Sequence, residues 1–325
     1  SFPYTAQALP QPASLSSPDS NNGGFTVSLP QPASLSSPHS DSGGFTARVN
    51  AQAAGGTVSV WLTTADLTTH LAQQADLTFA SGSGTDPTTI TVDDSKAYQS
   101  MDGFGASFTN SSALLVSKLD TNQRNTLMTN LFDANRGIGL NFLRLPMGAS
   151  DLTPPDVGEY SYDDVPQGQT DDRLDKFSIA HDQTLIPELQ QALSINGTIK
   201  IMGTPWSAPA WMKSTDSLEG GTLNSSAYAA YANYFVKFIQ AYKDKGIPIY
   251  AVTPQNEPLY TTTGYPNMSF PADQETNFIK NNLEPAFASN GINTKILGYD
   301  HNWDHQEYPK TILQDQTANG YTAGT

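Results

Sequence analysis

One carboxylate stands at the end of an apolar segment, in a setting suited to acid catalysis. Residues 251–258 read AVTPQNEP and end in Asn256, Glu257 and Pro258. A carboxylic acid at the mouth of a barrel, beside an amide, can protonate a leaving oxygen. The alternative is structural, with Glu257 capping the next helix or pairing with Arg144. The tripeptide alone leaves both interpretations open.

Two tryptophans in the preceding loop favour the catalytic interpretation. Residues 204–211 read TPWSAPAW and follow another apolar stretch. The faces of Trp206 and Trp211 can stack on the C–H faces of sugar rings, and the prolines restrict the loop. Core packing is the alternative for either side chain, because tryptophan is highly buried on average.

Alternating strands and helices must hold these side chains. From Gln99 onward, short apolar stretches predict strands, and segments with helical spacing predict helices around 127–132, 185–193 and 228–242. Strands separated by helices pair in parallel through right-handed crossovers, as in a (β/α) barrel or a doubly wound sheet. The expected strands are 103–108, 139–145, 199–203, 249–253, 295–299 and a last one starting near Tyr321.

The position of the polar side chains favours an α/β fold of the (β/α) barrel type over a doubly wound sheet. They follow several different strands, as in a barrel site: Arg144, Asp151, Trp206, Asn256, Glu257, Asp300 and His301. A doubly wound sheet would gather them at one switch point, usually after a glycine-rich turn. The segment Gly103-Phe104-Gly105 lacks the third glycine of that turn, so we expect no dinucleotide site.

The first hundred residues differ from the rest. Residues 9–26 recur as 29–46 with fifteen of eighteen positions identical, and their Pro, Ser and Gly content predicts a duplicated linker over 1–50, or else a small binding repeat. Short β-branched stretches at 57–63, 76–80 and 88–92 predict antiparallel strands within 51–98. The barrel would occupy 99–325.

Charge and composition exclude several classes of partner. The chain has 31 acidic and 16 basic residues, a formal charge of −15, so neither nucleic acid nor an anionic membrane is an expected partner. It has no cysteine, which excludes disulfides and a thiol nucleophile. Only 14% of residues are charged, which predicts a neutral, hydroxyl-rich surface.

Six segments, matching in order, resemble glycoside hydrolase family 30, which includes glucosylceramidases, β-1,6-glucanases and related β-glycosidases. They are 98–116 (YQSMDGFGASFTNSSALLV), 137–152 (GIGLNFLRLPMGASDL), 160–166 (YSYDDVP), 201–213 (IMGTPWSAPAWMK), 250–258 (YAVTPQNEP) and 321–325 (YTAGT). The resemblance implies a retaining mechanism on a (β/α)8 barrel with a side β-sandwich, to which the strands of 51–98 would belong.

The resemblance also implies a role for each matching residue. Glu257 would be the general acid/base, Asn256 the amide that bonds the sugar 2-hydroxyl, and Arg144 the arginine that orients the carboxylates.

The remaining matches would bind the sugar. Trp206 would form the floor of the sugar-binding subsite, supported by Trp211. Asp151 would accept hydrogen bonds from hydroxyls on the far side of the same sugar. We expect Asp300 and His301 to line the site. The family uses no catalytic metal and no cofactor is expected, although the four-residue spacing of His301 and His305 leaves a weak metal alternative.

The sequence departs from the family pattern in one respect. Retaining hydrolysis needs a second carboxylate, which the family places on its seventh strand, and this chain has no counterpart. Its other glutamates fall in loop or helix segments: Glu159, Glu188, Glu219, Glu275, Glu284 and Glu307. We therefore expect a truncated barrel of about six strands that is inactive by itself.

The loops at 203–223 and 255–266 look most like those of polysaccharide-cleaving members. We expect the full-length protein to be a secreted endo-β-1,6-glucanase acting on neutral β-glucan. A glucosylceramidase, or an exo-β-glucosidase or xylosidase acting on a β-glucoside, is the alternative within the family. A carbohydrate-binding pseudoenzyme is the alternative from another class.

Overall fold

The computed structural model describes residues 14–16, 24–28, 45–49, 57–80, 89–93 and 95–325. The chain divides into two compact units, Ser1–Met101 and Asp102–Thr325.

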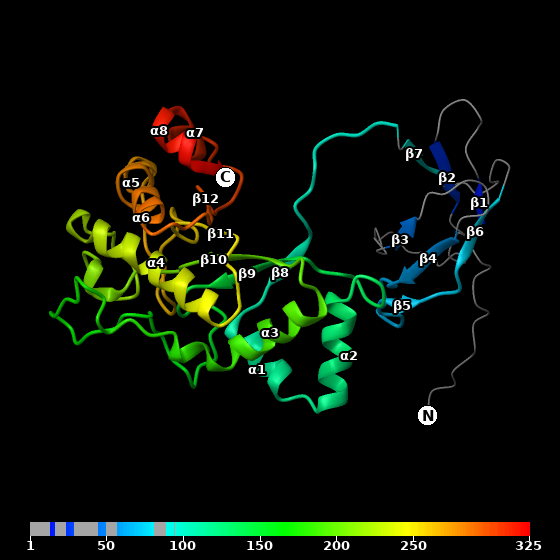
Figure 1. The fold of residues 1–325 in the computed structure, drawn as a ribbon, viewed down its shortest axis with the longest axis horizontal. Helices are drawn as coiled ribbons and strands as arrows, with labels where there is room; N and C mark the ends of the chain where they lie inside the picture. The colour runs from blue at the N-terminus through cyan, green and yellow to red at the C-terminus, as the bar shows by residue number, and fades with distance from the viewer. Residues whose placement is uncertain (1–13, 17–23, 29–44, 50–56, 81–88, 94) are drawn as a thin grey trace. The chain divides into compact units, whose positions relative to one another are not determined.

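The first unit contains one small sheet in which antiparallel pairing predominates (Figure 1). Its strands are β1 (Ser14–Ser16), β2 (Gly24–Ser28), β3 (Phe45–Val49), β4 (Thr57–Leu62), β5 (Ala72–Gln73), β6 (Leu77–Ala80) and β7 (Thr89–Asp93). The expected strands at 57–63, 76–80 and 88–92 correspond to β4, β6 and β7. In addition, β1, β2 and β3 lie within the duplicated segment that we expected to be a linker. The Phe-Thr pair that both copies share is part of β2 in the first copy and of β3 in the second.

The second unit is built on a six-stranded parallel sheet. Its strands are β8 (Gly105–Ser107), β9 (Phe142–Pro146), β10 (Lys200–Thr204), β11 (Ala251–Val252), β12 (Lys295–Leu297) and β13 (Thr322–Gly324). Each strand pairs with the one that precedes it in the sequence, whereas a doubly wound sheet reverses its order at a switch point. The six strand positions expected from the sequence are confirmed.

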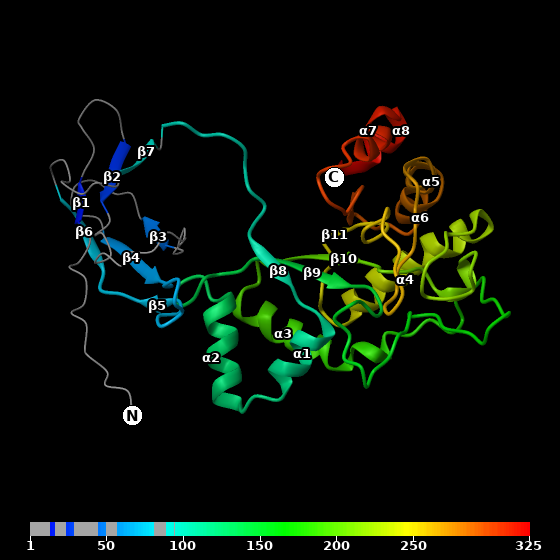
Figure 2. The same ribbon diagram turned by 180° about the vertical axis from the view of Figure 1, so that it is seen from behind.

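Helices fill the connections between these strands. They are α1 (Asn110–Ser117), α2 (Thr121–Phe132), α3 (Leu185–Ile195), α4 (Tyr228–Asp244), α5 (Ala272–Phe278), α6 (Glu284–Ser289), α7 (Glu307–Gln314) and α8 (Gln316–Tyr321). In both views α7 and α8 lie beside α5 and α6, at the end of the sheet that carries β12 (Figures 1 and 2). None of the helices in the described part of the chain is long and apolar enough to cross a bilayer.

The core of this unit is unusually aromatic around α4. That helix buries Tyr231, Tyr234, Phe235, Phe238 and Tyr242 completely or nearly so. It ends where expected, since Gly246 adopts a φ of +76° and the Ile247 N–H donates to the Tyr242 carbonyl. Although Ser225 and Ser226 precede the helix and serine commonly caps helices, a 3-10 turn at Ser225–Ala227 leads into it and no side chain caps its start.

Gly105 explains the glycine-rich start of the sheet. A Cβ atom at this position would lie 1.4 Å from the Phe142 carbonyl oxygen of the neighbouring strand. The glycine is therefore needed for the close approach of β8 and β9, a structural reason that has nothing to do with phosphate binding.

Candidate active site

Arg144 joins the ends of three strands. Its Nη2 atom donates to Asn256 Oδ1 and to Asp300 Oδ2, each at 2.7 Å. Arg144 lies within β9, Asn256 follows β11 and Asp300 follows β12. Because all three strands are parallel, these side chains meet at the carboxyl edge of the sheet, as the sequence predicted.

The Glu257 backbone is fixed between two neighbouring loops. Its N–H donates to the Asp300 carbonyl at 2.8 Å, and the N–H of Asn256 donates to the Pro205 carbonyl at 2.8 Å. Glu257 has a φ of +44°, a left-handed conformation that costs a non-glycine residue about 1–2 kcal/mol. Such strain persists only where the surroundings enforce it, and it is common at functional positions.

Neither structural alternative for Glu257 is supported by the described residues. The carboxylate that pairs with Arg144 is that of Asp300. The next helix, α5, has Pro271 at its N-cap and no side-chain cap.

Buried polar side chains that the sequence did not single out support this edge. Thr253 Oγ1 lies 3.0 Å from Asp300 Oδ2 and 2.9 Å from Thr204 Oγ1. Gln255 Nε2 donates to the Trp206 carbonyl at 2.7 Å. These residues belong to the segments that carry the predicted site, but threonine and glutamine gave no chemical signal of their own.

Trp206 is held against the arginine. The Arg144 Cζ atom lies 4.7 Å from the centre of the Trp206 ring, and the tryptophan is only 7% exposed. This cation–π contact covers one face of the indole, so a sugar could stack only on the other face or along its edge.

Trp211 has a supporting position. Its Nε1 atom donates to Asp163 Oδ2 at 2.9 Å, and both residues are buried. Burial raises the pKa of Asp163 to about 6, and the hydrogen bond from Trp211 opposes the shift. Asp163 lies in the YSYDDVP segment but had no role in the sequence interpretation.

Lys213 connects this loop with two others. It is 2% exposed, and its ammonium group has three acceptors: Ser207 Oγ at 2.7 Å, the Leu218 carbonyl at 2.7 Å and the Asn267 carbonyl at 2.8 Å. The tryptophan-bearing loop is thereby tied to the loop that follows Glu257.

Tyr265 belongs to the electrostatic surroundings of Asp151 and Glu257. Partial burial raises the pKa of Tyr265, and Tyr260 and the negative charges of Glu257 and Asp151 raise it further. Asp151 itself is exposed. Neither Tyr260 nor Tyr265 was singled out from the sequence, because nothing in residues 255–266 (QNEPLYTTTGYP) distinguishes them from other tyrosines.

His301 lies beside the site, and its ring contacts residues next to it in the sequence. Its Nδ1 atom accepts from the Asn302 N–H at 2.7 Å, and its ring stacks on Tyr299 with centroids 5.8 Å apart. His305 contacts Glu307 at 3.1 Å. Among the residues that the structure describes, no three His, Cys, Asp or Glu side chains are grouped to hold a metal ion.

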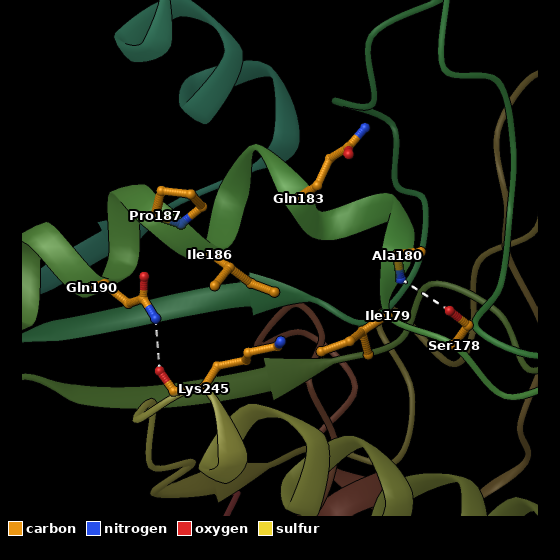
Figure 3. Close-up of a pocket in the computed structure, with 8 residues that line it drawn as sticks. All are labelled: Ser178, Ile179, Ala180, Gln183, Ile186, Pro187, Gln190 and Lys245. Atoms are coloured by element: carbon orange, nitrogen blue, oxygen red, sulfur yellow. Dashed lines mark hydrogen bonds between the residues drawn. The ribbon is translucent and has the colours of Figure 1, made fainter.

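An open pocket of about 480 Å³ lies elsewhere, between α3 and the end of α4 (Figure 3). Its lining is Ser178, Ile179, Ala180, Gln183, Ile186, Pro187, Gln190 and Lys245. Gln190 Nε2 donates to the Lys245 carbonyl at 2.8 Å across it. The lining contains no carboxylate, so this pocket is not suited to acid catalysis.

The strand ends therefore combine one strained glutamate, an amide, a cation paired with an aspartate, and a tryptophan. This set can bind hydroxyl groups and deliver a proton to an ether oxygen.

Within Asp102–Thr325, the other glutamates lie on helices or in connecting loops, as expected: Glu188 on α3, Glu275 on α5, Glu284 on α6, Glu307 on α7, and Glu159 and Glu219 in loops.

Comparisons with known proteins agree with this chemistry. The profile of the glycosyl hydrolase family 30 TIM-barrel domain matches residues 101–325. An endo-1,6-beta-D-glucanase of Neurospora crassa is 38% identical over 239 residues, which are 71% of this chain and 48% of that protein. A putative glucosylceramidase 4 of Caenorhabditis elegans is 35% identical over 259 residues, 74% of this chain and 48% of that protein.

Among solved structures, the endo-beta1,6-glucanase BT3312 superimposes with a TM-score of 0.72 at 32% identity, covering 82% of this chain and 59% of that one. The chain spans about half the length of the curated relatives it matches.

Proposed function

The chain belongs to glycoside hydrolase family 30, and we propose that the natural protein is a retaining β-glycosidase that cleaves neutral β-1,6-linked glucan internally. The observation that carries this proposal is the network of Arg144, Asn256 and Asp300 around the strained Glu257. The linkage is supported by three fungal relatives named endo-1,6-beta-glucanases, at 34% to 38% identity. Action on an extracellular polysaccharide would also require secretion, which we include in the proposal.

The fold proposed for the natural protein is a (β/α)8 barrel with a side β-sandwich. The sequential order of the six parallel strands is the order that barrel strands have, and the small sheet of the first unit would supply sandwich strands.

The proposed mechanism begins with protonation of the glycosidic oxygen by Glu257. Because Arg144 donates to Asn256 Oδ1, the amide nitrogen of Asn256 is the atom left to donate to a sugar hydroxyl. Asp151 would accept hydroxyl protons from the same sugar, and Trp206 would contact its C–H face.

A retaining mechanism also needs a nucleophilic carboxylate about 5–5.5 Å from the acid. No glutamate in residues 102–325 lies within a strand of the parallel sheet, and Glu257 itself is in the loop after β11. The proposal therefore requires the natural protein to carry this carboxylate on a further barrel strand. It follows that residues 1–325 alone should not hydrolyse glucan.

The substitution Glu257→Gln in the natural full-length protein tests the acid. Loss of the proton donor should lower kcat on β-1,6-glucan by roughly 10²- to 10⁴-fold. An aryl glucoside with a good leaving group needs little protonation, so its cleavage should fall much less. The matched control is Glu284→Gln, the same chemical change on α6, which should leave both rates unchanged. Equal activity of Glu257→Gln and wild type on glucan would refute the assignment.

A glucosylceramidase is the second candidate, because the Caenorhabditis elegans relative is nearly as similar as the glucanases. Release of oligosaccharides from linear β-1,6-glucan supports the first candidate. Cleavage of glucosylceramide in detergent micelles without action on glucan supports the second. Sugar binding without any hydrolysis by the full-length protein would indicate a pseudoenzyme.

A further inference from the structure

Glu275 is a buried carboxyl group that the proposed mechanism does not use. It lies in the first turn of α5 and is 0% exposed. Within the described residues, no lysine, arginine or histidine forms an ion pair with it. An unpaired carboxylate is costly to bury, and protonation is the usual way in which proteins avoid that cost.

A proton on Glu275 would let all the hydrogen bonds around it form at once. Tyr308 Oη lies 2.8 Å from Glu275 Oε2 and is also hydrogen-bonded to the Phe270 carbonyl oxygen. A tyrosine hydroxyl has one proton, and a carbonyl oxygen has none to give. If Tyr308 donates its proton to the Phe270 carbonyl, the 2.8 Å contact between Tyr308 Oη and Glu275 Oε2 is a hydrogen bond only when Glu275 donates a proton to Tyr308.

The electrostatic surroundings of Glu275 also favour its protonated form. Burial raises the pKa of Glu275 to about 7 and the Asp300 charge adds to the shift, whereas the hydrogen bonds that the Tyr299 N–H and the Tyr308 hydroxyl would donate to the ionised carboxylate oppose it. The titratable groups that face it are Tyr231 of α4, Tyr308 of α7, and Tyr299 and Asp300 of the loop after β12, while Asp273 of α5 faces Tyr308. None of these groups is a cation.

Glu275 is connected to the candidate acid from two sides. On one side, its Oε1 atom accepts from the Tyr299 N–H at 3.0 Å, next to Asp300, whose carbonyl holds the Glu257 N–H. On the other side, Tyr308 contacts the Phe270 carbonyl, and the Phe270 N–H donates to the Pro258 carbonyl at 2.9 Å. Pro258 directly follows Glu257.

We propose that Glu275 works as a neutral carboxylic acid that donates to Tyr308 while it accepts from the Tyr299 N–H, and that in this state it positions the Glu257 segment from both sides. Glu275 is thus a positioning residue for the reaction, and its kinetic consequence rests on the proposed glycosidase function. When Glu275 loses the proton, Tyr308 must turn to the carboxylate and the Phe270 carbonyl loses its partner. The loop that contains Pro258 is then held less firmly.

Glutamine is a close substitute for the protonated acid. Its Oε1 can accept from the Tyr299 N–H and its Nε2 can donate to Tyr308, at every pH. In Glu275→Ala both bonds are lost. Glu284→Gln, the same chemical change on α6, is the control.

The proton itself can be observed without an activity assay. At about pH 5, infrared difference spectra of the full-length protein, wild type minus Glu275→Gln, should show the carbonyl stretch of a protonated carboxyl, lost on raising the pH through about 7. Absence of that band at about pH 5 would overturn the proposal, whether or not the protein hydrolyses glucan.

Kinetics test the positioning role. The ratio of kcat/KM for Glu275→Gln to that of wild type should be near one at about pH 5 and exceed about three at about pH 8, because only wild type loses the proton. Glu275→Ala should lose at least about tenfold in kcat/KM, which glutamine restores. A ratio that does not change with pH would overturn the role. If Glu275→Ala does not fold, the glutamine ratio alone decides.

Discussion

Arg144 contacts three side chains of the candidate site. Its guanidinium donates to Asn256 and Asp300 and covers a face of Trp206. One planar cation therefore fixes the orientation of the amide, neutralises a carboxylate beside the acid and holds the aromatic ring. Lysine could replace the charge but neither the directional donors nor the stacking surface.

The substitution Arg144→Lys should consequently lower kcat/KM on β-1,6-glucan by about 10- to 100-fold, since displacement of a catalytic group by about 1 Å can cost that much. Steady-state kinetics of the full-length protein measure it, with thermal unfolding to verify the fold. Arg136→Lys is the control, because Arg136 forms an exposed pair with Asp133. If Arg144→Lys behaves like the control, the network does not position the site.

At the scale of elements, strand positions and the strand-end site could be predicted because both depend on local patterns. Short apolar stretches bounded by polar residues marked the six parallel strands, and the side chains after them meet because parallel strands end at one edge. The strands within the duplicated segment gave no such signal, since their Ser- and Gly-rich composition is typical of linkers.

The buried carboxylates could not be predicted. Asp163, Asp182 and Glu275 depend on partners that lie far away in the sequence, such as Trp211 for Asp163 and Tyr308 for Glu275. A sequence pattern shows which residue types are available, but it does not show which tyrosine turns toward which acid. Tyr260 and Tyr265 were missed for the same reason.

Asp182 connects the long segment between β9 and α3 with α4 through hydrogen bonds. It is 1% exposed, and its carboxylate accepts from three hydroxyls: Tyr160 at 3.0 Å, Tyr162 at 2.6 Å and Tyr242 at 2.6 Å. This segment carries Asp151 and Asp163. The position of Asp151, a predicted site residue, and that of Asp163, which bonds Trp211, therefore depend on a cluster outside the site.

Removal of this carboxylate should destabilise the fold strongly. In Asp182→Ala, three buried tyrosine hydroxyls lose their acceptor at about 1–3 kcal/mol each, so the free energy of unfolding should fall by roughly 3–5 kcal/mol or more. Chemical unfolding measures it. Asp244→Ala, at the exposed end of α4, should stay within about 0.5 kcal/mol of wild type. A loss below about 1 kcal/mol for Asp182→Ala would mean that the tyrosines find other partners.

At the scale of the whole chain, net charge favours a neutral over an acidic polysaccharide as the proposed substrate. The 325 residues carry a formal charge of −15. Many of the basic side chains are already paired with carboxylates in the structure, among them Arg124, Arg136, Arg144, Arg173, Lys200 and Lys280. An acidic polymer would thus meet net repulsion, whereas a neutral glucan would meet no long-range force.

The dependence of activity on salt tests this point. Between about 0.01 M and 1 M salt the Debye length falls from roughly 30 Å to 3 Å, so kcat/KM on neutral β-1,6-glucan should change by less than about twofold. For a carboxymethylated form of the same glucan, kcat/KM should be lower and should rise with salt, because screening removes the repulsion. Parallel assays on both polymers isolate the charge, since their linkages are identical. A steep fall with salt on the neutral glucan would show that charged contacts hold the substrate, which is contrary to the stacking and hydroxyl recognition proposed for Trp206 and Asp151.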